Sequence, residues 1–382
     1  MISPLKYKPV NWVDGMKLSS RHFVHTDLYH QDFVRDASSV FINRFNYGLL
    51  PPSAAQRSSL DMEVTEKAGN QIEVVLRRCN AVTAEGCRID IAPNAEYNNQ
   101  ISYTQYFDEK NTEAGLYHVL LLVNPFERVP DGFPDPEENP PRYPSVTAKY
   151  SIAILPATEI APMATDQYRL TIGRLIFNAG KVSVDQTYIP PASCILSHPG
   201  LIRYYELFST LMNELQLSAF KIIDKTTGID SVTALGKNIR LLSEKLLDYL
   251  ARVFFAYRNV GFQESPIYIA EYCANLAHVF FTGIKLTAAR EREDMLKYFY
   301  EWRDVTPGNF EELLARTIEL VYDHQNINES LSATEEFLKV LSALWAKLST
   351  LEYIGQHKEN IVVAEQQLVQ QVQTKRTWTL LD

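Results

Sequence analysis

Three histidines and one aspartate near the N-terminus are the side chains of this sequence best suited to bind a metal ion. His22, His25 and His30 lie within nine residues of one another, and Asp27 stands among them. Imidazole nitrogens and carboxylate oxygens are common ligands of zinc. In one straight helix, however, His25 and His30 lie about 140° apart, too far to converge on one ion. A metal-dependent enzyme using His22, His25 and Asp27 is therefore kept as an alternative hypothesis, and we expect no cofactor.

The rest of the sequence lacks the common motifs of nucleotide binding and hydrolysis. It contains no G-x-x-x-x-G-K-[ST], no G-x-G-x-x-G and no G-x-S-x-G pattern. The formal net charge is -9, whereas nucleic-acid binding needs a basic surface. The four cysteines show no C-x-x-C spacing, which favours buried thiols over a disulfide framework or a zinc site. We expect a protein that is not an enzyme and does not bind nucleic acid.

The sequence offers no segment for direct membrane insertion. Its first residues have no apolar core of signal-peptide length, and the longest apolar run, Val119–Val123, is too short to cross a bilayer. We expect a cytoplasmic protein that reaches a membrane through protein partners.

A helix and then many short strands are predicted for the first half of the chain. Ser19 suits a helix N-cap, and Phe33, Ala37, Val40 and Phe41 recur at helical spacing. Runs rich in β-branched and aromatic residues follow, and several alternate with the period of a half-buried strand. They predict an antiparallel β-sandwich or barrel. The runs are Ile72–Leu76, Cys87–Ile91, Ile101–Phe107, Leu116–Val123, Thr147–Leu155 and Tyr168–Phe177.

A stretch rich in proline and carboxylates interrupts these strands. Seven prolines lie between Pro125 and Pro144, with Glu127, Asp131 and other acidic residues among them. Because proline lacks an amide donor, the stretch is predicted to lie outside a sheet interior. We interpret it as an exposed, partly extended loop; a docking arm for a basic partner surface is the sharper hypothesis.

The second half of the chain is predicted to be helical. Two segments carry apolar residues at heptad spacing, which is typical both of a coiled coil between copies and of a helix in a monomeric bundle. Further helices are expected at Tyr268–Leu286, Arg290–Arg303, Phe310–His324 and Ala333–Leu351, and Pro266 and Pro307 suit the starts of two of them. Residues 360–382 could form a hairpin or a frayed helix. The candidate trimer-interface residues are Leu201, Tyr205, Phe208, Met212, Leu215, Leu235, Ile239, Leu242, Leu246, Tyr249 and Val253.

A pattern near the N-terminus, W-x-x-G-M-x-L-S-x-x-H-F, resembles the opening signature of the TssK family, trimeric baseplate subunits of bacterial type VI secretion systems. Its residues are Trp12, Gly15, Met16, Leu18, Ser19, His22 and Phe23. Three more stretches resemble the family: 46–49, 85–90 and the segment from Tyr188 through Pro190 to Pro191. We expect Trp12 and Phe23 to bury the N-terminal segment against the sandwich, so that the signature is structural.

The resemblance implies an α+β multidomain chain: a helix and β-sandwich shell (1–190), a helical-bundle neck for trimerisation (191–305) and a small, mostly helical C-terminal head (306–382). It implies a homotrimer that links the TssF and TssG baseplate proteins to the cytoplasmic region of TssM. Two departures from the family are Ser20, where proline is usual, and a short C-terminal region. An alternative with the same architecture is a trimer like the receptor-binding proteins of phage tails.

Overall fold

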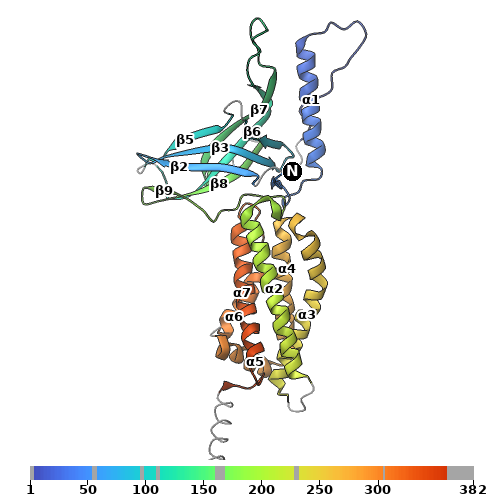
Figure 1. The fold of residues 1–382 in the computed structure, drawn as a ribbon, viewed down its shortest axis with the longest axis vertical. Coiled ribbons are helices and arrows are strands. Elements are labelled where there is room, and N and C mark those ends of the chain that lie inside the picture. The colour runs from blue at the N-terminus through green and yellow to red at the C-terminus, as the bar shows by residue number, and fades with distance from the viewer. Residues whose placement is uncertain are drawn as a thin grey trace, which may run out of the picture. The chain divides into compact units, whose positions relative to one another are not determined.

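Figure 1 shows the fold of the chain in a computed structural model, which describes residues 4–53, 58–94, 99–108, 112–159, 168–227, 232–303 and 306–358. The chain divides into two units. The β unit comprises Met1–Arg203, Gly261–Tyr268 and Tyr322–Glu329, and the helical unit comprises Tyr204–Val260, Ile269–Val321 and Ser330–Asp382.

The first sheet of the β unit is built on one long central strand. Strand β3 (Gln71–Val82) pairs antiparallel with β2 (Leu60–Lys67) and β1 (Gly48–Leu49), and also with β4 (Arg88–Ile91) and β5 (Ile101–Tyr106). Side chains of β3 alternate between buried and partly exposed, as expected of a strand with one face in a core. The β2 strand was not predicted; its side chains are mostly half-exposed, and charged residues separate its apolar ones.

The second sheet has the order β7-β6-β8-β9. Its strands are β6 (Gly115–Asp131), β7 (Ser145–Pro156), β8 (Tyr168–Asn178) and β9 (Lys181–Val184). Phe107, which follows β5, contacts Tyr117 of β6 and Phe177 of β8, with ring centroids 5.3 and 5.7 Å apart. These aromatic contacts join the two sheets in one core. The prediction of an α+β fold is confirmed.

Within the described ranges, six longer helices follow the strands. They are α2 (Pro199–Thr226), α3 (Ala234–Val260), α4 (Pro266–Leu286), α5 (Ala289–Arg303), α6 (Pro307–Ile318) and α7 (Ile327–Thr350), and short 3₁₀ turns lie at Ala157–Glu159, Ile195–Ser197 and Gly261–Gln263. As predicted, Pro266 and Pro307 begin helices, where a missing amide donor costs nothing. Helix α6 ends earlier than expected. None of the helices in the described ranges is long and apolar enough to cross a membrane.

The core of the helical unit surrounds Trp345 of α7. This side chain is fully buried, its ring meets Phe280 of α4 edge-on at 4.8 Å, and its Nε1 donates to Ser243 Oγ of α3 at 3.1 Å. Helix α7 thus packs in the same unit as α3 and α4. The boundary that the sequence analysis draws at residue 306 does not coincide with this division, and the tail predicted at 360–382 lies outside the described residues.

The heptad residues of α2 and α3 pack inside one chain. Nine of the eleven candidate interface residues are buried, and Tyr249 and Val253 are half-buried. The rings of Tyr205 and Tyr257 stack at 4.5 Å, and each hydroxyl donates to the other residue's carbonyl, at 2.5 and 2.7 Å. The use of these residues as a surface between copies stays a prediction, and this packing does not favour it, because most of the side chains are already occupied by their own chain.

Candidate functional site

Helix α1 (Ser20–Ser39) belongs to the β unit and has two faces of opposite polarity. Asp32, Arg35 and Ser39 are buried, whereas Phe23, Val24, Phe33 and Val34 are exposed and Leu28 is half-buried. This reverses the usual arrangement of an amphipathic helix on a folded domain. Phe33, Val40 and Phe41, whose helical spacing predicted a helix, are exposed.

The buried polar face binds backbone groups of neighbouring segments. The Asp32 carboxylate accepts the backbone N–H groups of Lys6 and Tyr7, the latter at 3.0 Å. Arg35 Nε donates to Asp32 Oδ1 at 2.8 Å, and Arg35 Nη1 donates to the Glu85 carbonyl at 3.4 Å. A buried ion pair is tolerated when hydrogen bonds satisfy both partners. The pair therefore fixes α1 to the N-terminal segment and to the turn before β4.

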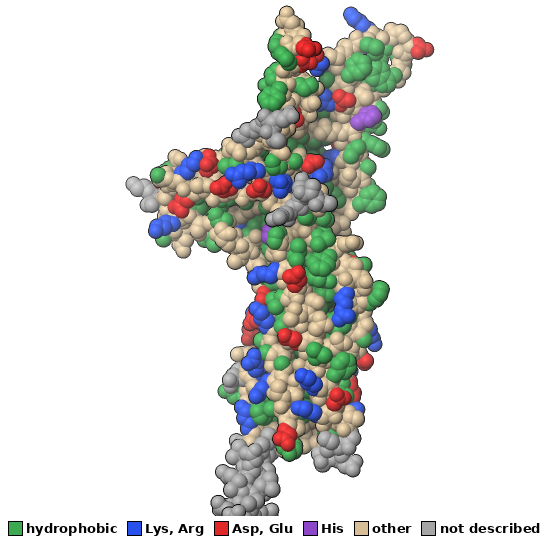
Figure 2. All heavy atoms as spheres, viewed as in Figure 1, with side chains coloured by type: hydrophobic (Ala, Val, Ile, Leu, Met, Phe, Trp, Pro, Cys, Tyr) green, Lys and Arg blue, Asp and Glu red, His purple; other side chains and the backbone are tan. Residues whose placement is uncertain are grey.

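The exposed surface of α1 carries large apolar side chains in the first and the last third of the helix, with His25, Asp27 and His30 exposed between them. Phe41, just beyond the helix, is 81% exposed, and Figure 2 shows hydrophobic side chains along α1 on the face in view. Apolar surfaces of this extent usually mark an interaction site. The exposed apolar residues on α1 and beside it are Trp12, Val13, Leu18, Phe23, Val24, Phe33, Val34, Val40 and Phe41.

The proline-rich stretch folds as a hairpin arm, defined here as residues 125–148. Strand β6 continues through Arg128–Asp131, which pairs with Ser145–Ala148, and an isolated bridge joins Asp135 to Arg142. A register shift between Asn124 and Arg128 accommodates Pro125 outside the ladder. Apart from Pro125, which is buried, the stretch is largely exposed, as predicted, but the prediction that it forms a loop is wrong for its paired ends.

The hairpin arm and α1 are joined and both carry exposed apolar groups. Arg128 Nη2 lies 3.3 Å from Asp27 Oδ2, so an ion pair connects the arm to the helix. We name α1 and the hairpin arm together the docking surface. The arm contributes Val129, Phe133, Tyr143 and Val146 as exposed apolar residues and Asp131, Asp135, Glu137 and Glu138 as carboxylates.

The signature residues form the start of α1 and not a buried anchor. Ser19 is the N-cap, and His22 Nδ1 accepts the Ser19 backbone N–H at 3.2 Å. Trp12 and Phe23 are 49% and 56% exposed, with ring centroids 6.2 Å apart. The prediction that they bury the segment against the sandwich is wrong, because the residues that hold it are Asp32 and Arg35. Gly15 (φ +78°) makes the expected turn, while Met16 is half-buried and Leu18 exposed.

The three histidines of α1 have separate surroundings. His22 caps the helix, the ring of His25 meets Tyr7 edge-on at 5.7 Å, and the ring of His30 meets Tyr29 at 5.5 Å. Within the described residues, no group of three or more histidine, cysteine or acidic side chains could hold a metal ion. The histidines therefore serve capping and ring contacts.

The other stretches quoted for the family resemblance meet through close backbone contacts. Leu49 N–H donates to the Pro191 carbonyl at 2.8 Å, and a Cβ added to Gly48 would lie 2.0 Å from that same oxygen. A Cβ added to Gly86 would lie 2.6 Å from the Arg35 carbonyl of α1. Glycine is required at both places, so these motifs hold the β unit together.

Tyr188 and Pro190 are buried beside a polar cluster that the sequence analysis missed. The Arg174 guanidinium lies over the Tyr188 ring, 4.9 Å from its centroid, and burial raises the pKa of the Tyr188 hydroxyl. Arg174 also donates to Asp185 at 2.7 Å and to Asn326 at 2.6 Å. Asn326 is far away in the sequence, so no local pattern could reveal the cluster. It anchors the segment between α6 and α7.

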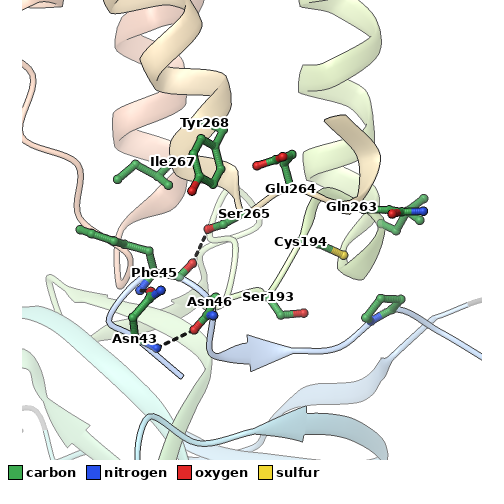
Figure 3. A pocket seen from close by; sticks show the side chains of 12 residues that line it. Asn43, Phe45, Asn46, Ser193, Cys194, Gln263, Glu264, Ser265, Ile267 and Tyr268 are labelled. Carbon is green, nitrogen blue, oxygen red and sulfur yellow. Dashed lines mark hydrogen bonds between the residues drawn. The ribbon is translucent and has the colours of Figure 1, made fainter. Parts of the chain in front are cut away.

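A pocket of about 510 Å³ opens in the β unit where segments 43–51, 193–196 and 263–268 meet (Figure 3). Two of its polar side chains bind backbone carbonyls: Ser193 Oγ donates to the Leu49 carbonyl at 2.9 Å, and Ser265 Oγ donates to the Phe45 carbonyl. The residues that line the pocket include Cys194 and Glu264 and no histidine. The hydrogen bonds of Ser193 and Ser265 hold the segments around the pocket together.

Comparison with solved structures finds the fold of TssK. A crystal structure of TssK matches with a TM-score of 0.53 at 15% identity, covering 86% of this chain and 68% of that one. TssK from the EAEC type VI system, in complex with a nanobody, gives 0.51 at 12% identity over 83% and 68%. A TssK-TssF-TssG baseplate subcomplex gives 0.46 at 12% identity over 88% and 99%. No protein-family profile and no curated protein matches the sequence.

Proposed function

We propose that this chain is a structural subunit of a type VI secretion baseplate, with the β unit as the shell and the helical unit as the neck. The observation that carries the proposal is the docking surface: a chain with the fold of TssK exposes a long apolar helix face next to an apolar and acidic arm. Such a surface is unfavourable in water unless a partner covers it. The chain acts by binding and needs no turnover.

The proposed partners follow from the family resemblance of the sequence. TssF and TssG bind the shell, and the hairpin arm makes that contact, with its carboxylates facing a basic surface. The C-terminal region binds the cytoplasmic part of TssM. The chain is cytoplasmic and reaches the inner membrane through these partners.

Self-association belongs to the same proposal. Three copies on one axis present three shells, which raises the effective concentration of each weak contact with the baseplate. Because nine of the eleven heptad residues of α2 and α3 are buried within one chain, we propose that the copies meet elsewhere.

Co-purification with TssF and TssG from the same genome tests the proposal. The wild-type chain should retain both, and Phe133→Ser with Tyr143→Ser should reduce retention at least tenfold, because two exposed aromatic anchors are lost from the arm. Tyr300→Ser on α5 removes an aromatic ring of similar exposure from the helical unit and should leave retention unchanged.

Equal retention of TssF and TssG by the wild-type chain and both variants would show that the hairpin arm is not part of the interface. A folded wild-type chain that retains neither TssF nor TssG would overturn the proposed function itself.

A further inference from the structure

We infer that copies of this chain contact one another through the exposed apolar face of α1, helix against helix in parallel. The inference rests on the proposed self-association and assigns it a surface. The exposed face of α1 thus takes the place of the heptad residues of α2 and α3, which are buried within one chain, as the proposed contact between copies. The occupant of the α1 face is a second copy of this chain.

The spacing of α1 supplies a seam of its own. Phe23, Phe33 and Val40 belong to a series with intervals of 3, 4, 3, 4 and 3 residues, which is the a/d pattern of a coiled coil. Unlike the heptads of α2 and α3, most of this series is exposed, although Thr26 is half-buried. The series, named the α1 seam, is Phe23, Thr26, His30, Phe33, Ala37 and Val40.

The apolar area on α1 suits an interface between two copies. Phe23, Phe33, Val34, Val40 and Phe41 are each more than half exposed. With an aromatic side chain contributing about 150–250 Å² when fully exposed, these five offer roughly 500–600 Å² of apolar surface per chain. Two copies together then bury roughly 1,000–1,200 Å² of apolar surface, at the lower end of what stable interfaces bury.

The distribution of charge favours a second copy of this chain, and not another partner, as the occupant of the α1 face. The chain carries a formal net charge of -9, so its copies repel each other over most of their surface. The α1 seam contains no lysine, arginine, aspartate or glutamate, which removes that repulsion locally. The carboxylates gather instead on the hairpin arm, where a basic partner would be favoured. The two parts of the docking surface thus suit different occupants.

Light scattering on the full-length chain tests the inference. The wild-type chain should be oligomeric at micromolar concentration, and Phe33→Asp with Val40→Asp should weaken association at least about a hundredfold, because two charges would be buried without partners. Both residues are exposed, so the variant should keep its helical circular dichroism and thermal midpoint. Leu217→Asp with Phe220→Asp, on the exposed face of α2, is the matched control and should stay oligomeric.

Cysteine cross-linking gives a second readout that does not depend on tolerance of aspartate. Ala37→Cys places a thiol on the seam, and Val24→Cys places one about 140° away around the helix. The native cysteines, Cys79, Cys87, Cys194 and Cys273, are all buried and should stay unreactive. Mild oxidation should therefore cross-link the Ala37→Cys chain and not the Val24→Cys chain.

A wild-type chain that is monomeric would overturn the inference. So would an α2 control variant that dissociates while the α1 variant stays oligomeric. So would an α1 variant that stays oligomeric but no longer retains TssF and TssG, because the face would then belong to a baseplate partner. That last result would leave the proposed function standing. Failure of the wild-type chain to retain TssF or TssG would be a separate result.

Discussion

Gly48 occupies a position with room for a backbone but not for a side chain. Its φ is +108°, and an added Cβ would lie 2.0 Å from the Pro191 carbonyl oxygen, where the segment after β9 crosses β1. Alanine must push the two segments apart and break the hydrogen bond from Leu49 to Pro191.

Gly48→Ala should therefore destabilise the β unit by about 3 kcal/mol or more, measured by urea unfolding. Gly69→Ala is the control, since Gly69 also has a positive φ (+78°) but no heavy atom of the described chain within 4 Å of an added Cβ. It should cost about 1 kcal/mol. Equal losses would mean that backbone strain, and not the contact with Pro191, makes Gly48 necessary.

Protonation of His198 should make the free energy of unfolding of the chain depend on pH. Its Nδ1 accepts the Gly200 N–H at 3.1 Å, and burial lowers its pKa from 6.5 to about 4. Because the unfolded chain binds the proton more tightly, the stability contribution is complete above pH 6.5 and is lost as the pH falls towards 4.

His198→Asn keeps an acceptor for Gly200 but does not titrate. The wild-type chain should lose on the order of 2 kcal/mol more than this variant between pH 7 and pH 4, measured by urea unfolding at each pH. Parallel losses in the two chains would show that protonation of His198 does not drive the acid effect.

At the scale of elements, the heptads of α3 belong to the helical core. Leu242 is 2% exposed, whereas its neighbour Leu241 is 41% exposed. Leu242→Asp should unfold the helical unit, with a loss of about 4 kcal/mol, because a charge would be buried without a partner. Leu241→Asp is the control and should cost less than about 1 kcal/mol. Thermal circular dichroism separates the two. A Leu242→Asp chain that stays folded but dissociates into monomers would instead show that the heptad residues of α3 lie between copies of the chain.

The sequence predicts where helices and strands lie better than it predicts which residues they pack against. Alternating runs such as Ile101–Phe107 and the prolines at helix starts place strands and helices correctly, because these signals are local. The heptad spacing of Leu242 and Leu246 is the same whether the seam packs within a chain or between chains. On α1, Asp32 and Arg35 are buried because backbone groups of residues 6, 7 and 85 bind them, and no local pattern encodes those partners.

At the scale of the whole molecule, some motif residues hold the β unit together and others, such as Phe23, lie on the docking surface. Gly48, Gly86 and Pro191 hold the β unit together through backbone contacts. The docking surface consists of exposed side chains on α1 and the hairpin arm. The resemblance to TssK could therefore be recognised from motifs of both kinds, whereas the exposure of Trp12, Leu18 and Phe23 required the structure.

Native mass spectrometry after co-expression with TssF and TssG from the same genome tests the central claim most directly. The proposed function predicts a single complex that contains TssF, TssG and several copies of this chain. A folded chain that is recovered alone, with no mass corresponding to a complex with either protein, would contradict it.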